Sequence, residues 1–558
     1  MAMLKQLRKG SEILMEMFKG HGVTHVFYME AVLRYTMLEM EKVGIKRVLC
    51  HSEKGAAYMA DGYARATGRP GVCLAQSVGA ANLAAGLQDA YLSHSPVLAI
   101  TGCKPSAEKH RNTYQELDHW PLYQPVTKYN VSIQTTDELP QALRQAFREA
   151  MTGAPGPVHL EFPQHQGMHI ELGETEGGTT VDKRFAQLPP FRPYPDPADL
   201  AEVVKQIYDA ERPVLVIGLG AVLSGAGPEL AAIIDRLGIP FATTMDGKGL
   251  VPDTHPLCVG PIGGYGRKCA NAILAEADLV VFIGSGLDDQ VTNKWSLPSQ
   301  DTHVIQIDID PSELGRNYMN SASIMADAKA AASSILPLLT GAHKSVAWAQ
   351  KATASVNAWR QAQAEIRASD SCPISAERLC HEVQQALPAN AALVADTGFS
   401  AIWAGSFIEL TQQGQRFFRP GGGSLGWGFP ASLGVKCGMP ERPVVCFTGD
   451  GAFWYHLNEL ETAVRHKINT VTVLNNNGGL GQCYRGIKAL YNGITGRSED
   501  LYEYSNVNFA ELAEKMGAFA IRVKNAKDIA PALREALSAN KPAVVEVLTN
   551  IAGDPQEY

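Results

Sequence analysis

Residues 443–479 read PVVCFTGDGAFWYHLNELETAVRHKINTVTVLNNNGG, and this stretch decides the fold class. An apolar run of strand length ends in Gly449-Asp450-Gly451, and a helical stretch follows it. A second apolar run then ends in three asparagines and two glycines. This alternation predicts parallel strands joined by a helix.

The residues at the two strand ends have the chemistry of a metal and diphosphate site. Asn477 follows Asp450 by 27 positions. A glycine-rich strand end lets backbone amides approach a diphosphate, while a carboxylate, an amide oxygen and a backbone carbonyl can complete a magnesium shell. A tight turn explains a lone Gly-Asp-Gly equally well, but its combination with the asparagine run indicates the site.

Length and composition set the number of domains and exclude some partners. The chain has 558 residues, of which 45% are apolar and 19% charged. At roughly 100–200 residues per domain, this composition predicts about three compact domains. The net charge is -8 and no long basic run is present, so nucleic acid is not an expected partner.

Cysteine usage and the apolar runs bear on the compartment. The ten cysteines are scattered singly without a C-x-x-C pair, which favours a reducing cytoplasm. Glu12 and Glu16 interrupt the apolar stretch of residues 1–22, so we expect an amphipathic surface helix there and no signal peptide. The longest apolar runs, such as 277–284, have strand length, so we expect neither a membrane span nor a membrane partner.

The chain divides into three blocks in which apolar runs alternate with helical stretches. We expect an α/β domain with a parallel sheet at each of residues 1–170, 200–340 and 371–558. A Gly-, Thr- and Pro-rich linker at 171–199 and a linker helix at 341–370 separate these blocks. The predicted strands lie within 23–28, 47–52, 71–77, 96–102, 156–163, 212–218, 240–244, 278–284, 303–310, 392–398, 443–451, 469–477 and 543–549.

GDGAFWYHLNELETAVRHKINTVTVLNNN (449–477) resembles the cofactor-anchoring motif of thiamine-diphosphate enzymes. Within the acetohydroxyacid-synthase-like branch of this superfamily, HSEKGAAYMADGYARATGRPGVCLAQSVGAANL (51–83) resembles the pyrimidine-binding segment. GGGSLGWGFPASLG (421–434) resembles the loop beneath the thiazolium ring, and DTGFS (396–400) resembles the loop that touches the diphosphate. The resemblance therefore extends along the chain.

The resemblance implies that the three blocks are pyrimidine-binding, central and diphosphate-binding domains, and that the cofactors are thiamine diphosphate and Mg²⁺. Asp450 and Asn477 are then expected to be magnesium ligands, together with the Gly479 carbonyl. The other residues expected to contact the cofactor are Gly398, Phe399, Ser400, Gly423, Leu425, Gly449, Gly451, Ala452, Leu480, Ser77 and Asn82.

Catalytic roles also follow from the resemblance. Glu53 matches the activating glutamate that hydrogen-bonds the aminopyrimidine, and Leu425 matches the apolar residue that holds the cofactor in a bent shape. Gln115, in NTYQELDHW, resembles a segment that reaches in from the partner subunit. Glu30 aligns with a position facing the reactive carbon, where it is either a proton shuttle or a solvated loop residue. His456 is expected to be a core or interface histidine.

In this family the activating glutamate and the diphosphate site belong to different subunits, so the resemblance implies at least a homodimer, and we expect a homotetramer. The central block contains Gly218-Leu219-Gly220, but Leu223 stands where a dinucleotide-binding motif has its third glycine. Relatives variously bind FAD, ADP or nothing in this domain, and the sequence does not decide among them.

Three departures bear on the reaction. Gln290 replaces an arginine of acetohydroxyacid synthases, Gly486 replaces a tryptophan, and residues 28–32 replace a glycine-rich turn. We therefore expect a 2-oxoacid decarboxylase or carboligase that passes a cofactor-bound enamine to a proton, an aldehyde or a ketone. The alternative is a 2-hydroxyacyl-CoA lyase or oxalyl-CoA decarboxylase, although the short stretch after the last strand favours small substrates. Acetolactate synthesis and a nucleotide-binding protein without lyase chemistry are less favoured.

Overall fold

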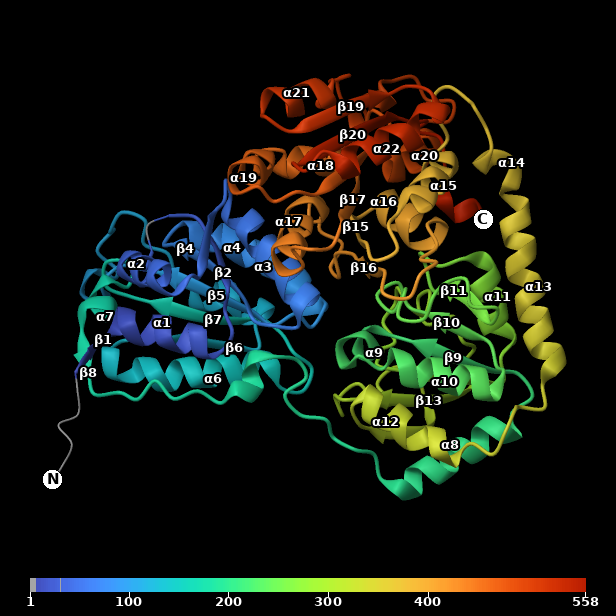
Figure 1. The fold of residues 1–558 in the computed structure, drawn as a ribbon, viewed down its shortest axis with the longest axis horizontal. Coiled ribbons are helices and arrows are strands. Elements are labelled where there is room, and N and C mark those ends of the chain that lie inside the picture. Colours follow the sequence, from blue (N-terminus) through green and yellow to red (C-terminus); the bar gives the residue numbers. More distant parts are fainter. Residues whose placement is uncertain (1–6, 31) are drawn as a thin grey trace.

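The computed structural model describes residues 7–30 and 32–558, and it contains three six-stranded parallel sheets flanked by helices (Figure 1). This confirms the predicted fold class of three parallel-sheet α/β domains. Parallel strands that are buried on both faces need continuous apolar runs, and β4 (Gly71–Gln76) and β12 (Leu279–Ile283) have them. An additional antiparallel pair joins β1 (Arg8–Lys9) to β8 (Glu174–Thr175).

The first and third sheets share one topology. Their strand orders are β3-β2-β4-β5-β7-β6 and β16-β15-β17-β18-β20-β19. Counted along the chain, both orders are second, first, third, fourth, sixth, fifth. The remaining strands are β2 (His25–Tyr28), β3 (Lys46–Leu49), β5 (Val97–Gly102), β6 (Tyr129–Ser132), β7 (Val158–Phe162), β15 (Ala392–Ala395), β16 (Arg416–Phe418), β17 (Val444–Gly449), β18 (Val471–Asn476), β19 (Phe519–Val523) and β20 (Ala543–Leu548).

The middle sheet has a different order, β11-β10-β9-β12-β13-β14, which is the order of dinucleotide-binding sheets. The glycines of its Gly218-Leu219-Gly220 motif, however, pack closely against Gly284 of the same sheet and are explained by that packing. A Cβ atom on Gly218 would lie 2.2 Å from the carbonyl oxygen of Gly284, and one on Gly220 would lie 2.8 Å from the Gly284 Cα. The strands are β9 (Pro213–Ile217), β10 (Phe241–Thr243), β11 (Cys258–Pro261), β13 (His303–Asp308) and β14 (Asn320–Met325).

Helices cover the sheets and connect them. Residues 176–196 run from the first domain to the middle one, and α13 (Val346–Ala362) runs along the outside from the middle domain to the third (Figure 1). No helix among the described residues is both long and apolar enough to cross a membrane. The other helices are α1 (Gly10–Gly20), α2 (Arg34–Val43), α3 (Glu53–Thr67), α4 (Gly79–Leu92), α5 (Trp120–Tyr123), α6 (Leu139–Met151), α7 (Met168–Leu172), α8 (Pro197–Asp209), α9 (Leu219–Ser224), α10 (Gly227–Leu237), α11 (Lys268–Glu276), α12 (Ala328–Ile335), α14 (Ala364–Arg367), α15 (Ala376–Ala386), α16 (Phe399–Ile402), α17 (Gly428–Gly438), α18 (Asp450–His456), α19 (Glu459–His466), α20 (Gly481–Leu490), α21 (Phe509–Lys515) and α22 (Ile529–Ser538).

The N-terminal surface helix expected over residues 1–22 is represented by α1, whose buried side chains include Ile13, Leu14 and Phe18. Residues 1–6 of that prediction lie outside the described part of the chain. The described helix is therefore amphipathic, with one face packed on the first sheet.

Helices α3 and α17 bring the first and third domains into backbone contact. A Cβ atom on Gly62 would lie 2.2 Å from the carbonyl oxygen of Ala431, and one on Gly434 would lie 1.9 Å from that of Met59. Only glycine permits such an approach. The third domain is therefore packed directly against the helix that begins at Glu53.

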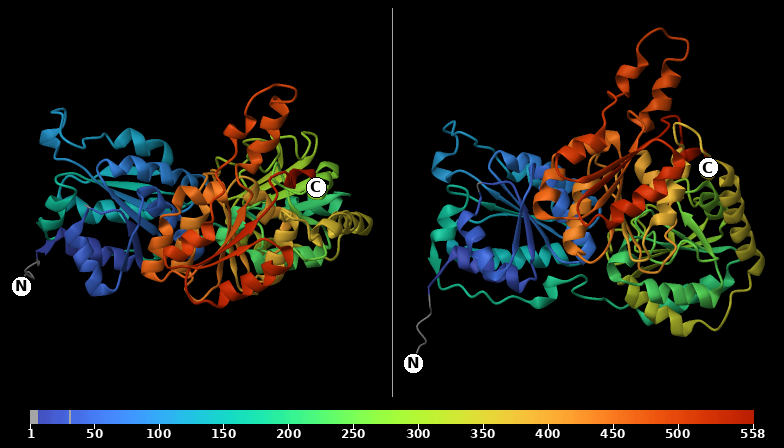
Figure 2. Two further views of the ribbon diagram at one scale, coloured as in Figure 1. Left: turned by 90° about the horizontal axis from the view of Figure 1, so that it is seen from above. Right: turned by 45° about the horizontal axis from the view of Figure 1, so that its top comes forward.

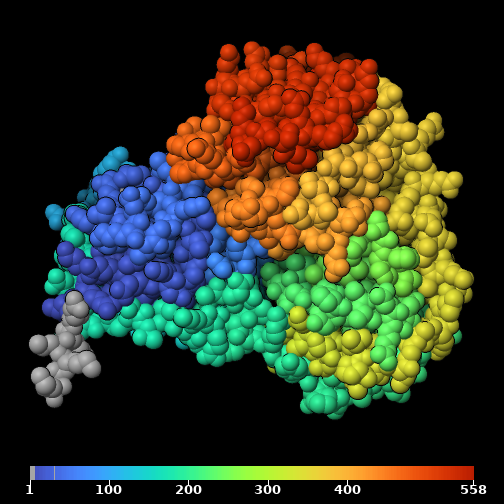
Figure 3. Space-filling view, in the orientation of Figure 1, coloured from blue at the N-terminus to red at the C-terminus, as the bar shows by residue number. Residues whose placement is uncertain are grey.

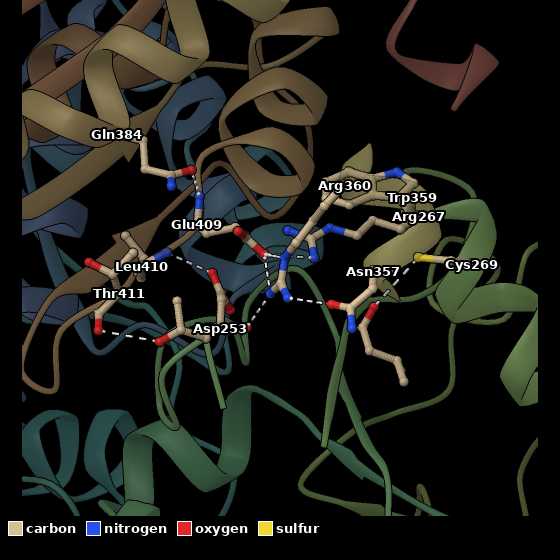
Figure 4. A network of polar contacts seen from close by, with 12 residues as sticks. Asp253, Arg267, Cys269, Asn357, Trp359, Arg360, Gln384, Glu409, Leu410 and Thr411 are labelled. Atoms are coloured by element: carbon tan, nitrogen blue, oxygen red, sulfur yellow. Dashed lines mark hydrogen bonds and ion pairs between the residues drawn. The ribbon is translucent and has the colours of Figure 1, made fainter. Parts of the chain in front are cut away.

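A buried ionic network joins the middle and third domains (Figure 4). Glu409 accepts hydrogen bonds from Arg360 of α13 at 2.9 Å and from Arg267 at 3.3 Å. The Arg267 guanidinium also lies 4.0 Å from the centre of the Trp359 ring, and Asp253 accepts the backbone N–H of Leu410 at 2.8 Å. Because these contacts come from three separate segments, they fix the middle domain relative to the third.

Candidate active site

A cavity of about 660 Å³ opens at the carboxyl end of the third sheet, where that sheet meets the middle domain and the end of α4. Figure 3 shows the blue, orange and green parts of the chain meeting near the centre of one face of the molecule. Open α/β sheets bind ligands at the carboxyl ends of strands where the strand order reverses. In the third sheet this reversal lies between β15 and β17.

All of the third-block residues that were predicted to contact the metal or the cofactor line this cavity. They follow β15, β16, β17 and β18, so four separate loops converge on one space. The predicted residues that line it are Gly398, Phe399, Ser400, Gly423, Leu425, Gly449, Asp450, Gly451, Ala452, Asn477, Gly479 and Leu480.

Asp450 has the environment of a carboxylate that binds a cation. Its side chain is buried, and burial raises its pKa to about 7 although the backbone N–H groups of Asn477 and Gly479 act against the rise. Among the described residues, the groups that act on its carboxylate are backbone N–H donors and not a basic side chain. An uncompensated buried carboxylate is costly, and a bound cation would remove that cost.

The neighbouring donors suit a hard divalent ion. Within the described ranges, no cluster of three or more His, Cys, Asp and Glu residues could hold a metal. A metal shell at Asp450 would therefore use the side-chain amide of Asn477, the carbonyl of Gly479 and ligand oxygens, which is the oxygen-rich set that Mg²⁺ prefers. The residues present therefore fit a bound Mg²⁺ ion.

The glycines of the cavity make room for a phosphate-bearing ligand. Gly398 and Gly423 have φ values of 67° and 71°, in the left-handed region that favours glycine. A Cβ atom on Gly451 would lie 2.8 Å from the side chain of Leu480. Backbone amides here can approach a diphosphate without obstruction from side chains.

Part of the cavity wall was not predicted. Asp246, Tyr265, Asp288 and Asp289 of the middle domain line the cavity, as does Arg419. Arg419 donates to Asp246 at 2.5 Å and 3.0 Å. No motif marks these residues, because they come from separate turns that only the packing of two domains brings together.

The residues predicted from the first block form a second group at the carboxyl edge of the first sheet. Asn82 donates to Glu53 at 3.2 Å, and the Ser77 hydroxyl donates to the carbonyl of Gln115 at 2.6 Å. Gly79 lies against the Glu53 carboxylate, where a Cβ atom would come within 2.4 Å. None of these residues lines the cavity of about 660 Å³, so one chain presents two separate half-sites.

The other singled-out residues lie as follows. Glu30 is exposed, forms an ion pair with Arg34 at 2.7 Å and does not line the cavity. Gln290 does line it. Gly486 lies on α20, which projects from the body of the molecule (Figure 2), and a Cβ atom there would meet open space. His456 is buried against Tyr58 in an edge-to-face contact, and burial lowers its pKa to about 4, as suits a core histidine.

Comparison with known proteins gives matches along nearly the whole chain. Residues 8–122 match the family described as "Thiamine pyrophosphate enzyme, N-terminal TPP binding domain", 200–335 match its "central domain", and 396–547 match its "C-terminal TPP binding domain". The chain is 32% identical to the probable acetolactate synthase large subunit of Methanocaldococcus jannaschii, over 98% of this chain and 92% of that protein. It is 33% identical to the acetolactate synthase of Arthrospira platensis (96% and 93% covered) and 29% identical to the acetolactate synthase isozyme 1 large subunit of Escherichia coli K12 (90% and 87%).

Proposed function

Because the chain belongs to the thiamine pyrophosphate enzymes, in their acetolactate-synthase-like branch, we propose that it acts on small 2-oxoacids or related carbonyl compounds. In this proposal it makes or breaks a carbon–carbon bond next to the carbonyl, with thiamine pyrophosphate (thiamine diphosphate) and Mg²⁺ bound in the cavity of about 660 Å³.

The separation of the two half-sites is the observation that carries the proposal. The cavity gathers Asp450, Asn477 and the glycine loops, whereas Glu53 and Gln115 lie on a different sheet edge of the same chain. A second copy that offers its Glu53 edge to this cavity completes the site. The active unit is therefore at least a homodimer, with two equivalent sites related by twofold symmetry.

Each group has a defined task in this site. Asp450, Asn477 and the Gly479 carbonyl would hold Mg²⁺, and residues 398–400 would contact the diphosphate through their backbone. When bound, the cofactor supplies a nucleophilic carbon and accepts the electron pair released at the substrate carbonyl. Glu53 of the second copy would hold a proton for the aminopyrimidine ring, and Leu425, which lines the cavity, would give the cofactor an apolar support.

The charges of the cavity support an uncharged acceptor. Arg419 is the only basic residue among its described lining residues, and it is already paired with Asp246. Asp288 and Asp289 add negative charge, and Gln290 cannot form the bidentate ion pair by which arginine holds a carboxylate. An aldehyde, a ketone or a proton needs no ion pair and is not repelled by the two aspartates. A second 2-oxoacid carries a carboxylate, so its binding is weakened by this arrangement.

Acetolactate formation is the second candidate, because the relatives carry the name acetolactate synthase.

No nucleotide is assigned to the middle domain, since mutual packing already accounts for Gly218, Gly220 and Gly284. The absorbance spectrum of the purified protein tests for flavin. Assays with pyruvate, benzoylformate, glyoxylate, cyclic diketones, acyloins and acyl-CoA esters separate the substrate classes, including the acyl-CoA alternative.

Complementation between variants tests the shared site. Asp450→Ala and Glu53→Gln should each be inactive alone. When the two are co-expressed, random pairing makes about half of the dimers hybrids, each with one intact site, so about a quarter of the parent's activity should return. A mixture as inactive as its components would show that one chain supplies both halves of a site.

A further inference from the structure

The backbone of Gln115 is held in an unfavourable conformation. Its φ is 65°, in the left-handed region that residues other than glycine rarely adopt. Its carbonyl accepts a hydrogen bond from the hydroxyl of Ser77, which is completely buried, at 2.6 Å. Unfavourable backbone conformations persist where surrounding contacts impose them, and they gather at functional sites.

Ser77 is in turn held by a buried ion pair. The carbonyl of Ser77 accepts from the Nε2 atom of His119 at 2.9 Å. The Nδ1 atom of His119 lies 3.1 Å from Glu161 and 3.1 Å from the hydroxyl of Thr101. His119 and Thr101 are fully buried and the Glu161 side chain is only 13% exposed, so water has little access to these contacts.

The hydrogen bonds of the adjacent histidine determine where the protons lie. His159 Nδ1 is 2.7 Å from the side-chain oxygen of Asn130, whose amide nitrogen donates to the Trp120 carbonyl at 3.1 Å. This fixes the amide orientation, so Nδ1 of His159 carries a proton. Burial lowers the pKa of His159 to about 3, so the ring is neutral and its Nε2 accepts the Thr101 proton at 2.7 Å.

Thr101 therefore has no proton left for His119. The Nδ1 atom of His119 faces two acceptors and its Nε2 atom faces a carbonyl, so both nitrogens carry protons. Glu161 balances the charge and accepts a second hydrogen bond from Ser132 at 2.7 Å. Although burial opposes it, these hydrogen bonds hold the pKa of Glu161 at about 2.

We propose that the buried His119–Glu161 ion pair is a positioning device that fixes Gln115 through Ser77. A charged donor forms a shorter and stronger hydrogen bond to the Ser77 carbonyl than a neutral one, which holds the Ser77 hydroxyl under Gln115. The proposal rests on the proposed function only in placing Gln115 at the cavity of a second copy. Neither His119 nor Glu161 lines the cavity of about 660 Å³, so they act through Ser77.

Limited proteolysis tests the positioning without any cofactor or substrate. Lys109 and Arg111 are exposed in the loop between β5 and α5 that contains Gln115, and they offer trypsin sites. Glu161→Gln, His119→Gln and the milder Ser77→Ala should each speed cleavage at this loop by roughly tenfold, because release of a local contact raises the population of the open loop. His21→Gln is the matched control, since it removes another buried histidine of the same domain that stacks on Phe147.

Two further measurements separate positioning from stability. In the parent's proton NMR spectrum we expect a downfield, exchange-protected imidazolium N–H signal, absent in His119→Gln and kept in His21→Gln. In active enzyme the same three variants should lower kcat by about 10- to 100-fold with little change in KM, as misplacement of a positioned group does. Cleavage and kcat no more affected than in His21→Gln would overturn the proposal. Proteolysis and NMR decide it even if no thiamine-diphosphate-dependent activity is found.

Discussion

The carboxylate of Glu459 accepts the backbone N–H of Ser52 at 3.0 Å, across the boundary between the third and first domains. It also accepts the N–H of His51 at 3.1 Å. Ser52 caps α3 by accepting from Gly55 at 2.9 Å, and α3 begins at Glu53. The start of α3, where Glu53 stands, is therefore anchored to the third domain of its own chain, even though Glu53 serves the cavity of a second copy in the proposed dimer.

Replacement of Glu459 should loosen this support. Glu459→Ala leaves two backbone N–H groups without their acceptor, which costs about 2 kcal/mol of unfolding free energy. We also expect turnover to fall because Glu53 loses its fixed direction. Urea unfolding and steady-state kinetics measure the two effects, and turnover at the parent's level would show that α3 keeps Glu53 in place unaided.

Asp450→Ala should abolish binding of the metal and the cofactor. The variant lacks the only carboxylate among the expected magnesium ligands, and a metal shell of neutral oxygens binds weakly. Chelation of the parent should likewise remove activity, and Mg²⁺ with thiamine diphosphate should restore it. Calorimetric titration decides the matter, since binding as tight as the parent's would place the metal elsewhere.

Glu53→Gln should slow the reaction without unfolding the protein. The amide keeps the size of the side chain and its contact with Asn82, but it cannot hold the transferable proton. The expected loss in turnover is on the order of 10²–10⁴, the usual contribution of a positioned acid or base. Hydrogen exchange at the thiazolium carbon of the holoenzyme is the direct measurement, and an unchanged exchange rate would contradict the role.

The acceptor site should disfavour a second 2-oxoacid. With pyruvate as donor we expect little or no acetolactate, and only a modest gain in Gln290→Arg, because Asp288 and Asp289 of the same cavity wall would still oppose a second carboxylate. Product analysis by mass spectrometry separates acetolactate from acetaldehyde and acyloins. Acetolactate formation by the parent at a kcat/KM of about 10⁴ M⁻¹s⁻¹ or above would restore the synthase interpretation.

The ionic network of Glu409 should stabilise the protein in a pH-dependent way. Glu409→Gln leaves the buried Arg267 cation without its counter-ion, which we expect to cost about 3 kcal/mol. Burial opposes ionisation, but Arg267 and Arg360 hold the pKa of Glu409 below its ordinary value of 4.5. The contribution is therefore full above about pH 4.5 and is lost as the pH falls below it. Urea midpoints of parent and variant should converge on acidification, and a constant difference would exclude this cause.

The interior strands could be predicted from the sequence, whereas most edge strands could not. In the three parallel sheets the strands that the sequence did not reveal are β6, β11, β14, β16 and β19, and each of them is an edge strand. In β14 exposed side chains alternate with less exposed ones and only Ile324 is buried, and β6 has no buried residue. An edge strand needs fewer apolar residues, so it lacks the continuous run that marks a buried parallel strand.

The candidate site was predictable where chemistry follows directly after a strand. Asp450 and Asn477 each follow an apolar run, so their pairing could be inferred from spacing. The cavity wall at Tyr265 and the ion pair between His119 and Glu161 could not, because each joins residues from different loops or strands. A buried histidine pair leaves no periodic pattern, and only the folded chain shows its partners.

The identical strand order of the first and third sheets has a consequence for the ancestry of the protein. The loop that follows each of the first four strands of the first sheet has a counterpart after the same strand of the third sheet. The corresponding residues in these loops are Glu30 and Gly398, Glu53 and Gly423, Ser77 and Asp450, and Gln115 and Asn477. Such correspondence is what duplication of a single gene segment leaves behind once the copies have diverged in sequence. In the proposed site the loops of the third sheet serve the charged diphosphate and those of the first sheet serve the aromatic ring, so the shared strand order is the feature by which a common origin of the two domains can be recognised.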